Sequence, residues 1–291
     1  MRRSFSTLRF RTASLALSLA LLTLPGASHA ASPAAAVPFM AHQALYDLKL
    51  QKSRGNASVN SATGRILYSF SGSACEGYSS DFRQVSELNS GEDKSTLSDL
   101  RSTSWEAGDG KSYRFKIDTR MNDGDPANID GMAERDGDHV TVKLKQPVQK
   151  TFTLDGKTVF PTEQIHRIIA AARDGKSVLE LAVYDGSDTG EKVYNTLTVI
   201  GQAIPGDRAA TEPDPSTTND ALKKLTRWPV TVSYYDQSAK PADGGEQTPV
   251  YAMSFELYEN GVSRALVLDY NDFVIGGAMS KFNVKDSKPC K

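Results

Sequence analysis

The chain has 291 residues, of which 39% are hydrophobic, and its 34 basic and 35 acidic residues give a formal net charge of −1. The charges are interspersed without a long basic run, which argues against nucleic acid or an anionic lipid surface as the main partner. The length and the apolar content predict a globular protein that buries a full core.

The first 30 residues have the pattern of a secretory signal peptide. Four arginines precede an apolar run over residues 15–24, and a small-x-small sequence ends at Ala30. We expect cleavage after Ala30 and export to the periplasm, because the run is shorter than the roughly 20 apolar residues of a membrane span. An uncleaved anchor is the alternative. Residues 31–38, rich in Ala and Pro, are predicted to be a flexible leader before a single domain at residues 39–291.

Much of the remaining chain alternates between apolar and polar residues, as strands with one buried face do. The alternation is clear where Tyr113, Phe115 and Ile117 alternate with charged residues. We predict further strands at residues 46–50, 66–70, 78–85, 96–105, 140–144, 179–183, 193–200, 228–234, 251–257, 266–270 and 272–284. The Asn260-Gly261 pair predicts a hairpin between two of them. Two polar segments, residues 201–220 and 237–247, are predicted to be exposed loops. A dozen or so strands predict an all-β, antiparallel fold.

One helix is predicted, at residues 162–173, with Thr162 as its N-cap and Gly175 just past its end. Its apolar residues Ile165, Ile168, Ile169 and Ala172 fall on one face. A face this apolar needs cover, so we expect the long sheet to curl around a central helix.

The two cysteines, Cys75 and Cys290, are the only ones in the sequence. An exported chain reaches an oxidising compartment, so we predict a disulfide between them. Two free thiols, or intermolecular pairing of the C-terminal cysteine, are the alternatives.

The motifs for catalysis or metal binding are incomplete. Two Gly-Lys-Ser triplets, at residues 110–112 and 175–177, lack the earlier glycine and the following helix of a phosphate-binding loop, and are predicted to be turns. Residues 122–134 resemble a calcium loop, but Asn128 occupies the position that requires glycine, so we predict a solvated acidic hairpin loop. His42, His139 and His166 have no second ligand at metal spacing. We therefore predict no catalytic residues, no metal site and no cofactor.

Five segments carry a resemblance to a known family: residues 75–84, 160–184, 227–236, 256–262 and 268–273. With the terminal cysteine, they resemble the EipB family of periplasmic cell-envelope integrity proteins, over nearly all of the mature chain. The resemblance implies an antiparallel sheet wound into a broken barrel or spiral, with a helix in its bore. It also implies a role in keeping the envelope intact, and it carries no catalytic residues.

Three hypotheses for the function follow. The first two are non-enzymatic: a protein that binds another envelope protein, or a carrier of an apolar ligand such as a lipid. The third is an enzyme that acts on an envelope polymer, a glycan or peptidoglycan. If the curled sheet leaves an apolar groove beside the helix, we predict that Phe39, Tyr46, Trp228 and Ile168 line it.

Overall fold

The computed structural model describes residues 38–54, 59–91, 94–239, 247–287 and 290, which belong to one compact unit. Residues 1–37, with the predicted signal peptide and most of the leader, lie outside the described residues. The helices are α1 (Pro161–Arg173) and α2 (Pro215–Thr218), and in the described part of the chain neither is long and apolar enough to cross a membrane. The strands are β1 (His42–Ser53), β2 (Val59–Ser73), β3 (Gly77–Ser90), β4 (Ser95–Glu106), β5 (Ser112–Met121), β6 (Ala127–Asp136), β7 (His139–Gln146), β8 (Lys150–Asp155), β9 (Val178–Val183), β10 (Tyr194–Ile200), β11 (Arg227–Asp236), β12 (Tyr251–Tyr258), β13 (Ser263–Asp269) and β14 (Phe273–Val284).

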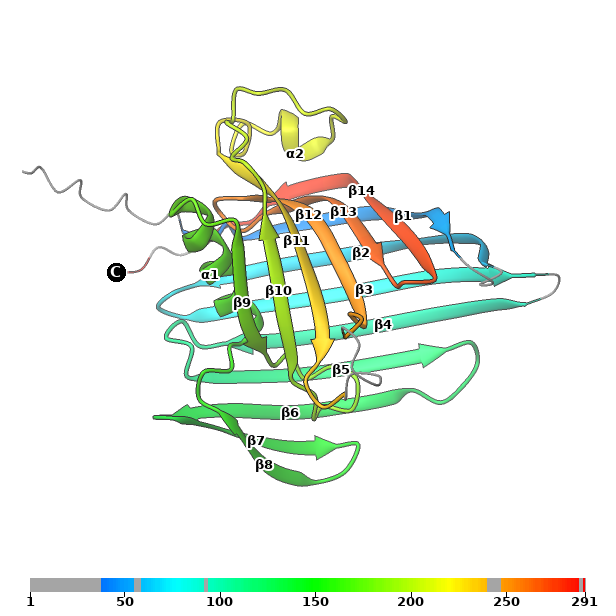
Figure 1. Ribbon diagram of the computed structural model, residues 1–291, viewed down its shortest axis with the longest axis vertical. Coiled ribbons are helices and arrows are strands. Elements are labelled where there is room, and N and C mark those ends of the chain that lie inside the picture. The colour runs from blue at the N-terminus through cyan, green and yellow to red at the C-terminus, as the bar shows by residue number, and fades with distance from the viewer. Residues whose placement is uncertain (1–37, 55–58, 92–93, 240–246, 288–289, 291) are drawn as a thin grey trace, which may run out of the picture. The chain divides into compact units, whose positions relative to one another are not determined.

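All of these strands form one antiparallel sheet, which confirms the predicted all-β fold (Figure 1). The order runs from β8 down to β1 and then from β14 down to β9. Because β1 pairs with β14, the first and last strands lie in the middle, and β8 and β9 form the two edges. A sheet of this width curls rather than staying flat, and bulges such as the one at Leu45/Tyr46 increase the twist. The result is an open, broken barrel.

Two strands, β6 and β8, are absent from the sequence-based prediction. β6 occupies most of residues 122–134, so the prediction of a hairpin loop there is wrong. The turn is confined to residues 122–126, and it begins with Asn122 in the left-handed region at φ 49°. The inward positions of β6 include Gly131 and Ala133, which weaken the apolar alternation. Pairing with β5 and β7 therefore decides that this segment is a strand.

Residues 201–220 are mostly exposed loop, as predicted, but part of the segment is anchored to the sheet. They contain the short α2, whose Ser216 is fully buried. The buried Arg264 of β13 pairs with Asp214 at 2.8 Å and with Glu256 at 2.5 Å. The sequence did not predict this anchor, because Arg264 lies 50 residues from Asp214 in the chain.

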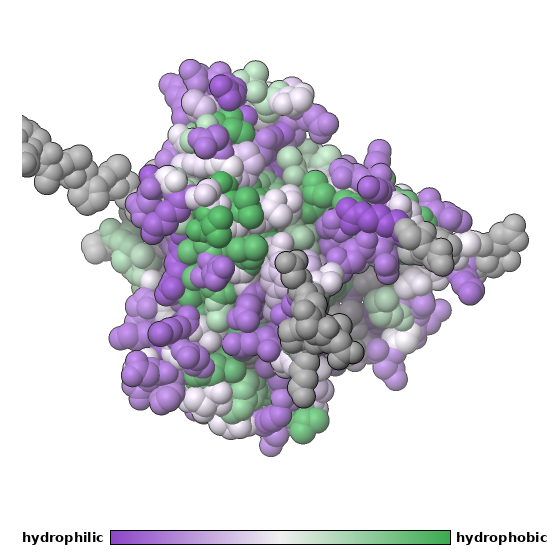
Figure 2. Space-filling model, in the orientation of Figure 1, coloured by the Kyte–Doolittle hydropathy of each residue, from purple (hydrophilic) through white to green (hydrophobic). Residues whose placement is uncertain are grey.

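Edge strand β9 carries an exposed apolar surface on its outer side. Val178 of β9 and Val199 of β10 are cross-strand partners and are 52% and 50% exposed. Figure 2 shows a hydrophobic patch over these two strands. At the far end of β9, Val159 adds a single parallel bridge: its N–H donates to Ala182 O at 2.8 Å, and its carbonyl accepts from Tyr184 N at 3.0 Å. The rest of this edge of β9 has no paired strand in the described sheet.

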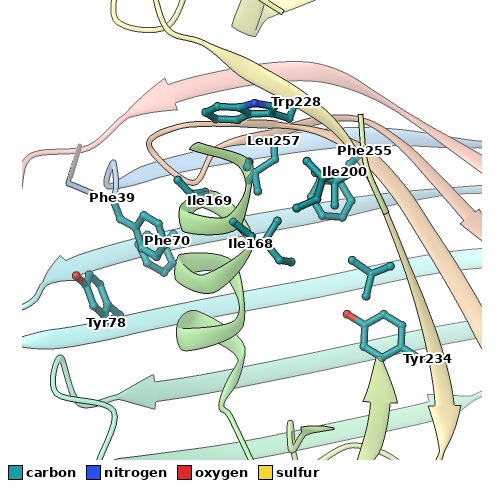
Figure 3. Packing of buried hydrophobic residues seen from close by; sticks show 14 of the residues in the cluster. Phe39, Phe70, Tyr78, Ile168, Ile169, Ile200, Trp228, Tyr234, Phe255 and Leu257 are labelled. Carbon is teal, nitrogen blue, oxygen red and sulfur yellow. The ribbon is translucent and has the colours of Figure 1, made fainter. Parts of the chain in front are cut away.

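Helix α1 lies between the two halves of the curled sheet (Figure 3). Ile168 is fully buried, and Ile169 is 5% exposed. They belong to one cluster, here called the helix cluster. Besides residues of α1, it includes Phe39, Phe70 and Tyr78 on one side and Trp228, Val230, Tyr234, Phe255 and Leu257 on the other. The predicted central helix is therefore confirmed. Its opposite side, with His166, Arg167 and Ala170, is exposed.

Helix α1 ends as predicted, with Gly175 just past its C-terminus. Gly175 adopts φ 72°, and its N–H donates to Ala172 O at 3.1 Å. The next N–H, from Lys176, donates to Ala171 O at 2.9 Å. This pair of hydrogen bonds is the Schellman motif, which favours glycine because the left-handed conformation costs it little. The triplet at 175–177 is thus a turn, as predicted, and β9 follows it.

Candidate functional site

The N-terminus of α1 is capped from another strand rather than by Thr162. Phe160 is the N-cap residue and makes no side-chain hydrogen bond, so the predicted N-cap is wrong. Instead, the carboxylate of Glu106, the last residue of β4, accepts from Thr162 N at 2.7 Å and from Glu163 N at 3.0 Å. These two N–H groups belong to the unpaired donors of the first helical turn. The cap therefore ties α1 to the wall of the barrel.

The capping carboxyl of Glu106 is almost fully buried, at 3% exposed. Burial raises its pKa to about 7 from the ordinary 4.5, although the two backbone donors oppose the shift. In the unfolded chain this group ionises from pH 4.5 upward, whereas in the folded protein it stays protonated until about pH 7. Its contribution to stability is therefore complete below pH 4.5 and is lost as the pH rises to about 7.

We expect Glu106→Gln to remove this pH dependence. The free energy of unfolding of the variant, relative to wild type, should rise by about 3 kcal/mol between pH 4.5 and pH 8, at about 1.4 kcal/mol per pKa unit. Urea unfolding across this pH range measures the difference. Glu87→Gln, an exposed change on β3, is the matched control and should leave the profile parallel to wild type. Parallel profiles for Glu106→Gln as well would contradict the assignment.

The two cysteines are joined in the structure, with Cys75 Sγ and Cys290 Sγ 2.08 Å apart. Cys75 lies in the turn between β2 and β3. The neighbouring Glu76 accepts a hydrogen bond through its carbonyl from Trp105 Nε1 at 3.3 Å. Trp105 precedes Glu106, so the disulfide-bearing turn and the N-terminus of α1 are connected through the end of β4.

The four residues predicted to line a groove lie in the packed interior. Phe39, Ile168 and Trp228 belong to the helix cluster, and each is at most 8% exposed. Tyr46 lies in a second apolar cluster, and its hydroxyl donates to Ser263 O at 2.7 Å. The structure thus brings three of them together around α1 and places Tyr46 elsewhere. Their predicted role in ligand binding stays a prediction.

A row of aromatic rings crosses the concave face of β10 to β14. Its members, here called the aromatic row, are Tyr194, Tyr234, Tyr251, Tyr270 and Phe273, with successive ring centroids 6.2, 4.4, 6.4 and 5.1 Å apart. Burial raises the pKa of Tyr234 to about 12, so this hydroxyl is neutral at physiological pH. The inner end of the row is buried, but Tyr251 and Phe273 are half-buried and Tyr270 is 36% exposed. An inward-facing aromatic surface therefore remains accessible.

The opposite half of the sheet contributes apolar side chains to the same concave side. Phe82 of β3 and Leu100 of β4 are only partly buried. Burial raises the pKa of Tyr270, and the side chain of Gln84 in β3 opposes this shift. At the buried end, Nε2 of Gln164 in α1 has no hydrogen-bond partner among the described residues. No sequence pattern predicts this site, because its members come from six different strands, from a turn and from α1.

A hollow lies on the outer face of the sheet. It has a volume of about 970 Å³ and is bordered by β1, β2, β13 and β14, with Gly276 and Ala278 among its lining residues. The Asp47–Arg65 ion pair, 2.9 Å long, also borders it. None of the four predicted lining residues contributes to it.

The histidines have structural contacts. His42 Nδ1 lies 2.7 Å from Met40 O, and burial lowers the pKa of this side chain. His166 stacks on Phe39 with ring centroids 3.9 Å apart, and His139 is exposed. Among the described residues, no group of three or more His, Cys, Asp or Glu side chains is arranged to hold a metal ion.

The comparisons with known proteins agree with one another, and each match covers most of the chain. The EipB-like family model matches residues 33–286. The cell envelope integrity protein EipB of Brucella abortus (strain 2308) is 34% identical over 279 residues, which cover 95% of each chain. The crystal structure of a beta-barrel-like protein of domain of unknown function DUF1849, also from Brucella abortus, superposes with a TM-score of 0.77 and 31% identity. That match covers 86% of this chain and all of the solved one.

Proposed function

Since the chain belongs to the EipB-like family, we propose that it is a periplasmic protein that helps to maintain the cell envelope and does so by binding rather than catalysis. The relative from Brucella abortus is named a cell envelope integrity protein, which supports the role in the envelope. The signal-peptide pattern of residues 1–30 supports export to the periplasm.

We propose further that the ligand is apolar and binds on the concave face beside α1. One observation carries this proposal: the outer end of the aromatic row remains half-buried or exposed although it faces inward. Phe82 and Leu100 on the opposite half add apolar surface to the same side. Ligand sites are mostly apolar concave surfaces with a few polar groups, and the tyrosine hydroxyls supply such groups here.

Tyr251→Ala is expected to reduce binding of the ligand by about fivefold, because the ring lies in the middle of the row and a lost aromatic contact is worth about 1 kcal/mol. Native mass spectrometry of protein purified from periplasm measures the fraction that carries a lipid-sized adduct. Tyr235→Ala is the matched control, because its side chain lies on the outer face of β11.

Two results would defeat the proposal. One is wild-type protein without any apolar adduct. The other is a stable Asp, Glu or His variant that fails to restore envelope integrity in a deletion strain, which would favour the enzyme that acts on a glycan or peptidoglycan.

A further inference from the structure

The two edges of the sheet face one cleft, here called the seam. It has a volume of about 600 Å³. Its lining includes Thr153, Leu154 and Asp155 of β8, Glu180, Leu181 and Ala182 of β9, and Arg167 of α1. The bridge between Val159 and Val183 closes one end of it. Beyond that bridge, β8 and β9 are not paired with each other, so the barrel stays open between these two edge strands.

On the β9 side, the backbone of every second residue points into the seam. Ala182 O and Tyr184 N bond Val159, so they point away from β10. In an antiparallel strand the N–H and C=O of one residue point to the same side, and the side alternates along the chain. The N–H and C=O groups of Val178 and Glu180 therefore point outward too, where the described sheet has no paired strand.

The β8 side has the same arrangement. Gly156 N donates to Asp138 O at 2.9 Å, so Gly156 and, by alternation, Leu154 and Phe152 face β7. The backbone groups of Thr151 and Thr153 then point into the seam. Unpaired backbone donors and acceptors of both edges thus border one cleft.

The side chains around the seam alternate as they do on the sheet. Leu154, Leu181 and the nearby Val193 lie on its inner side, packed toward the barrel interior. Thr153, Asp155 and Glu180 lie on its outer side. The outer side continues into the exposed apolar patch of Val178 and Val199 over β9 and β10 (Figure 2). Open strand edges and exposed apolar patches are both typical of sites where another chain docks.

We propose that the seam binds an extended segment of another polypeptide, which inserts as an additional strand between β8 and β9. Such a segment presents N–H and C=O groups on both of its sides, which matches the two edges that border the seam. An acyl chain has no such groups. An edge strand of a second copy has one side already paired with β7 or β10, so it satisfies only one edge.

The side chains around the seam indicate the pattern of apolar and polar residues in the inserted strand. Residues of the inserted strand alternate between the apolar inner side, at Leu154 and Leu181, and the polar outer side. The partner is therefore a protein with an unpaired extended segment of alternating apolar and polar residues. This site uses residues other than the aromatic row, so the inference goes beyond the proposed ligand and does not depend on it.

Photo-crosslinking in cells that produce the full chain tests the proposal. The probe is p-benzoylphenylalanine in place of Thr153, with the same group in place of Lys116, an exposed outer position on the paired strand β5, as the control. We expect a covalent adduct with a different protein from position 153 and none from position 116. Mass spectrometry of the adduct should place the crosslink in a segment with alternating apolar and polar residues.

A matched pair of variants separates the contribution of the backbone N–H at position 180 from that of the side chain. Glu180→Pro removes an N–H that points into the seam. It leaves the hydrogen bonds between β9 and β10 intact, and proline is tolerated on edge strands of this kind. It should reduce the adduct at least tenfold, whereas Glu180→Ala, which keeps the N–H, should retain it. Val178→Pro, at the first position of β9, provides the same loss if Glu180→Pro fails to fold.

Several outcomes overturn the inference: no adduct from position 153, an adduct only with a second copy of the chain, or an adduct that the proline variants leave unchanged. Tyr251→Ala distinguishes the two proposals, because it should reduce binding of the apolar ligand and leave the crosslinked adduct in place.

Discussion

Replacing Cys75 and Cys290 together by alanine is expected to lower the free energy of unfolding by about 5 kcal/mol. The disulfide joins residues 215 apart, so it restricts nearly the whole described chain in the unfolded state. It also holds the C-terminal residues beside the turn that contacts Trp105, one residue before the cap of α1. Urea unfolding of wild type and of the double variant, followed by circular dichroism, measures the loss.

Reduced wild-type protein is the control for this prediction. It keeps both cysteine side chains, so its unfolding midpoint should match that of the double variant if the bond itself provides the stability. Equal midpoints for the oxidised wild type and the double variant would show that the bond contributes nothing.

Ile168→Ala is expected to lower the free energy of unfolding by about 2–5 kcal/mol and the melting temperature by roughly 10 °C. Ile168 is fully buried in the helix cluster, and the side chains around it come from both halves of the sheet. Because a rigid sheet on each side cannot collapse into the space, the substitution leaves a cavity. Thermal unfolding followed by tryptophan fluorescence reports the change, since Trp228 belongs to the same cluster.

Arg167→Ala is the control for Ile168→Ala. Arg167 is the next residue along α1, but its side chain is 47% exposed and pairs with Glu163 one turn earlier, at 2.5 Å. Exposed pairs of this kind contribute about 0.3–0.5 kcal/mol, so the melting temperature should change little. Similar losses for the two variants would show that α1 is not the centre of the core.

The sequence alone predicted the features that depend on neighbours close in the chain. The alternation of Tyr113, Phe115 and Ile117 predicted β5, because a strand with one buried face needs an apolar residue at every second position. The period of Ile165, Ile168 and Ile169, ended by Gly175, predicted α1 for the same kind of reason. The Asn260-Gly261 pair lies in the turn between β12 and β13, which confirms that hairpin with a loop of four residues between the strands.

The tertiary structure decided the features that depend on distant partners. β6 is a strand because β5 and β7 pair with it, although Gly131 and Ala133 interrupt its apolar pattern. Glu106 caps α1 from 56 residues away, so no local cap was needed at Thr162. The aromatic row and the seam exist only because β1 pairs with β14, which puts β8 and β9 at the two edges. Strand order depends on long-range pairing and on the curl of the whole sheet, and neither leaves a periodic signal within one segment.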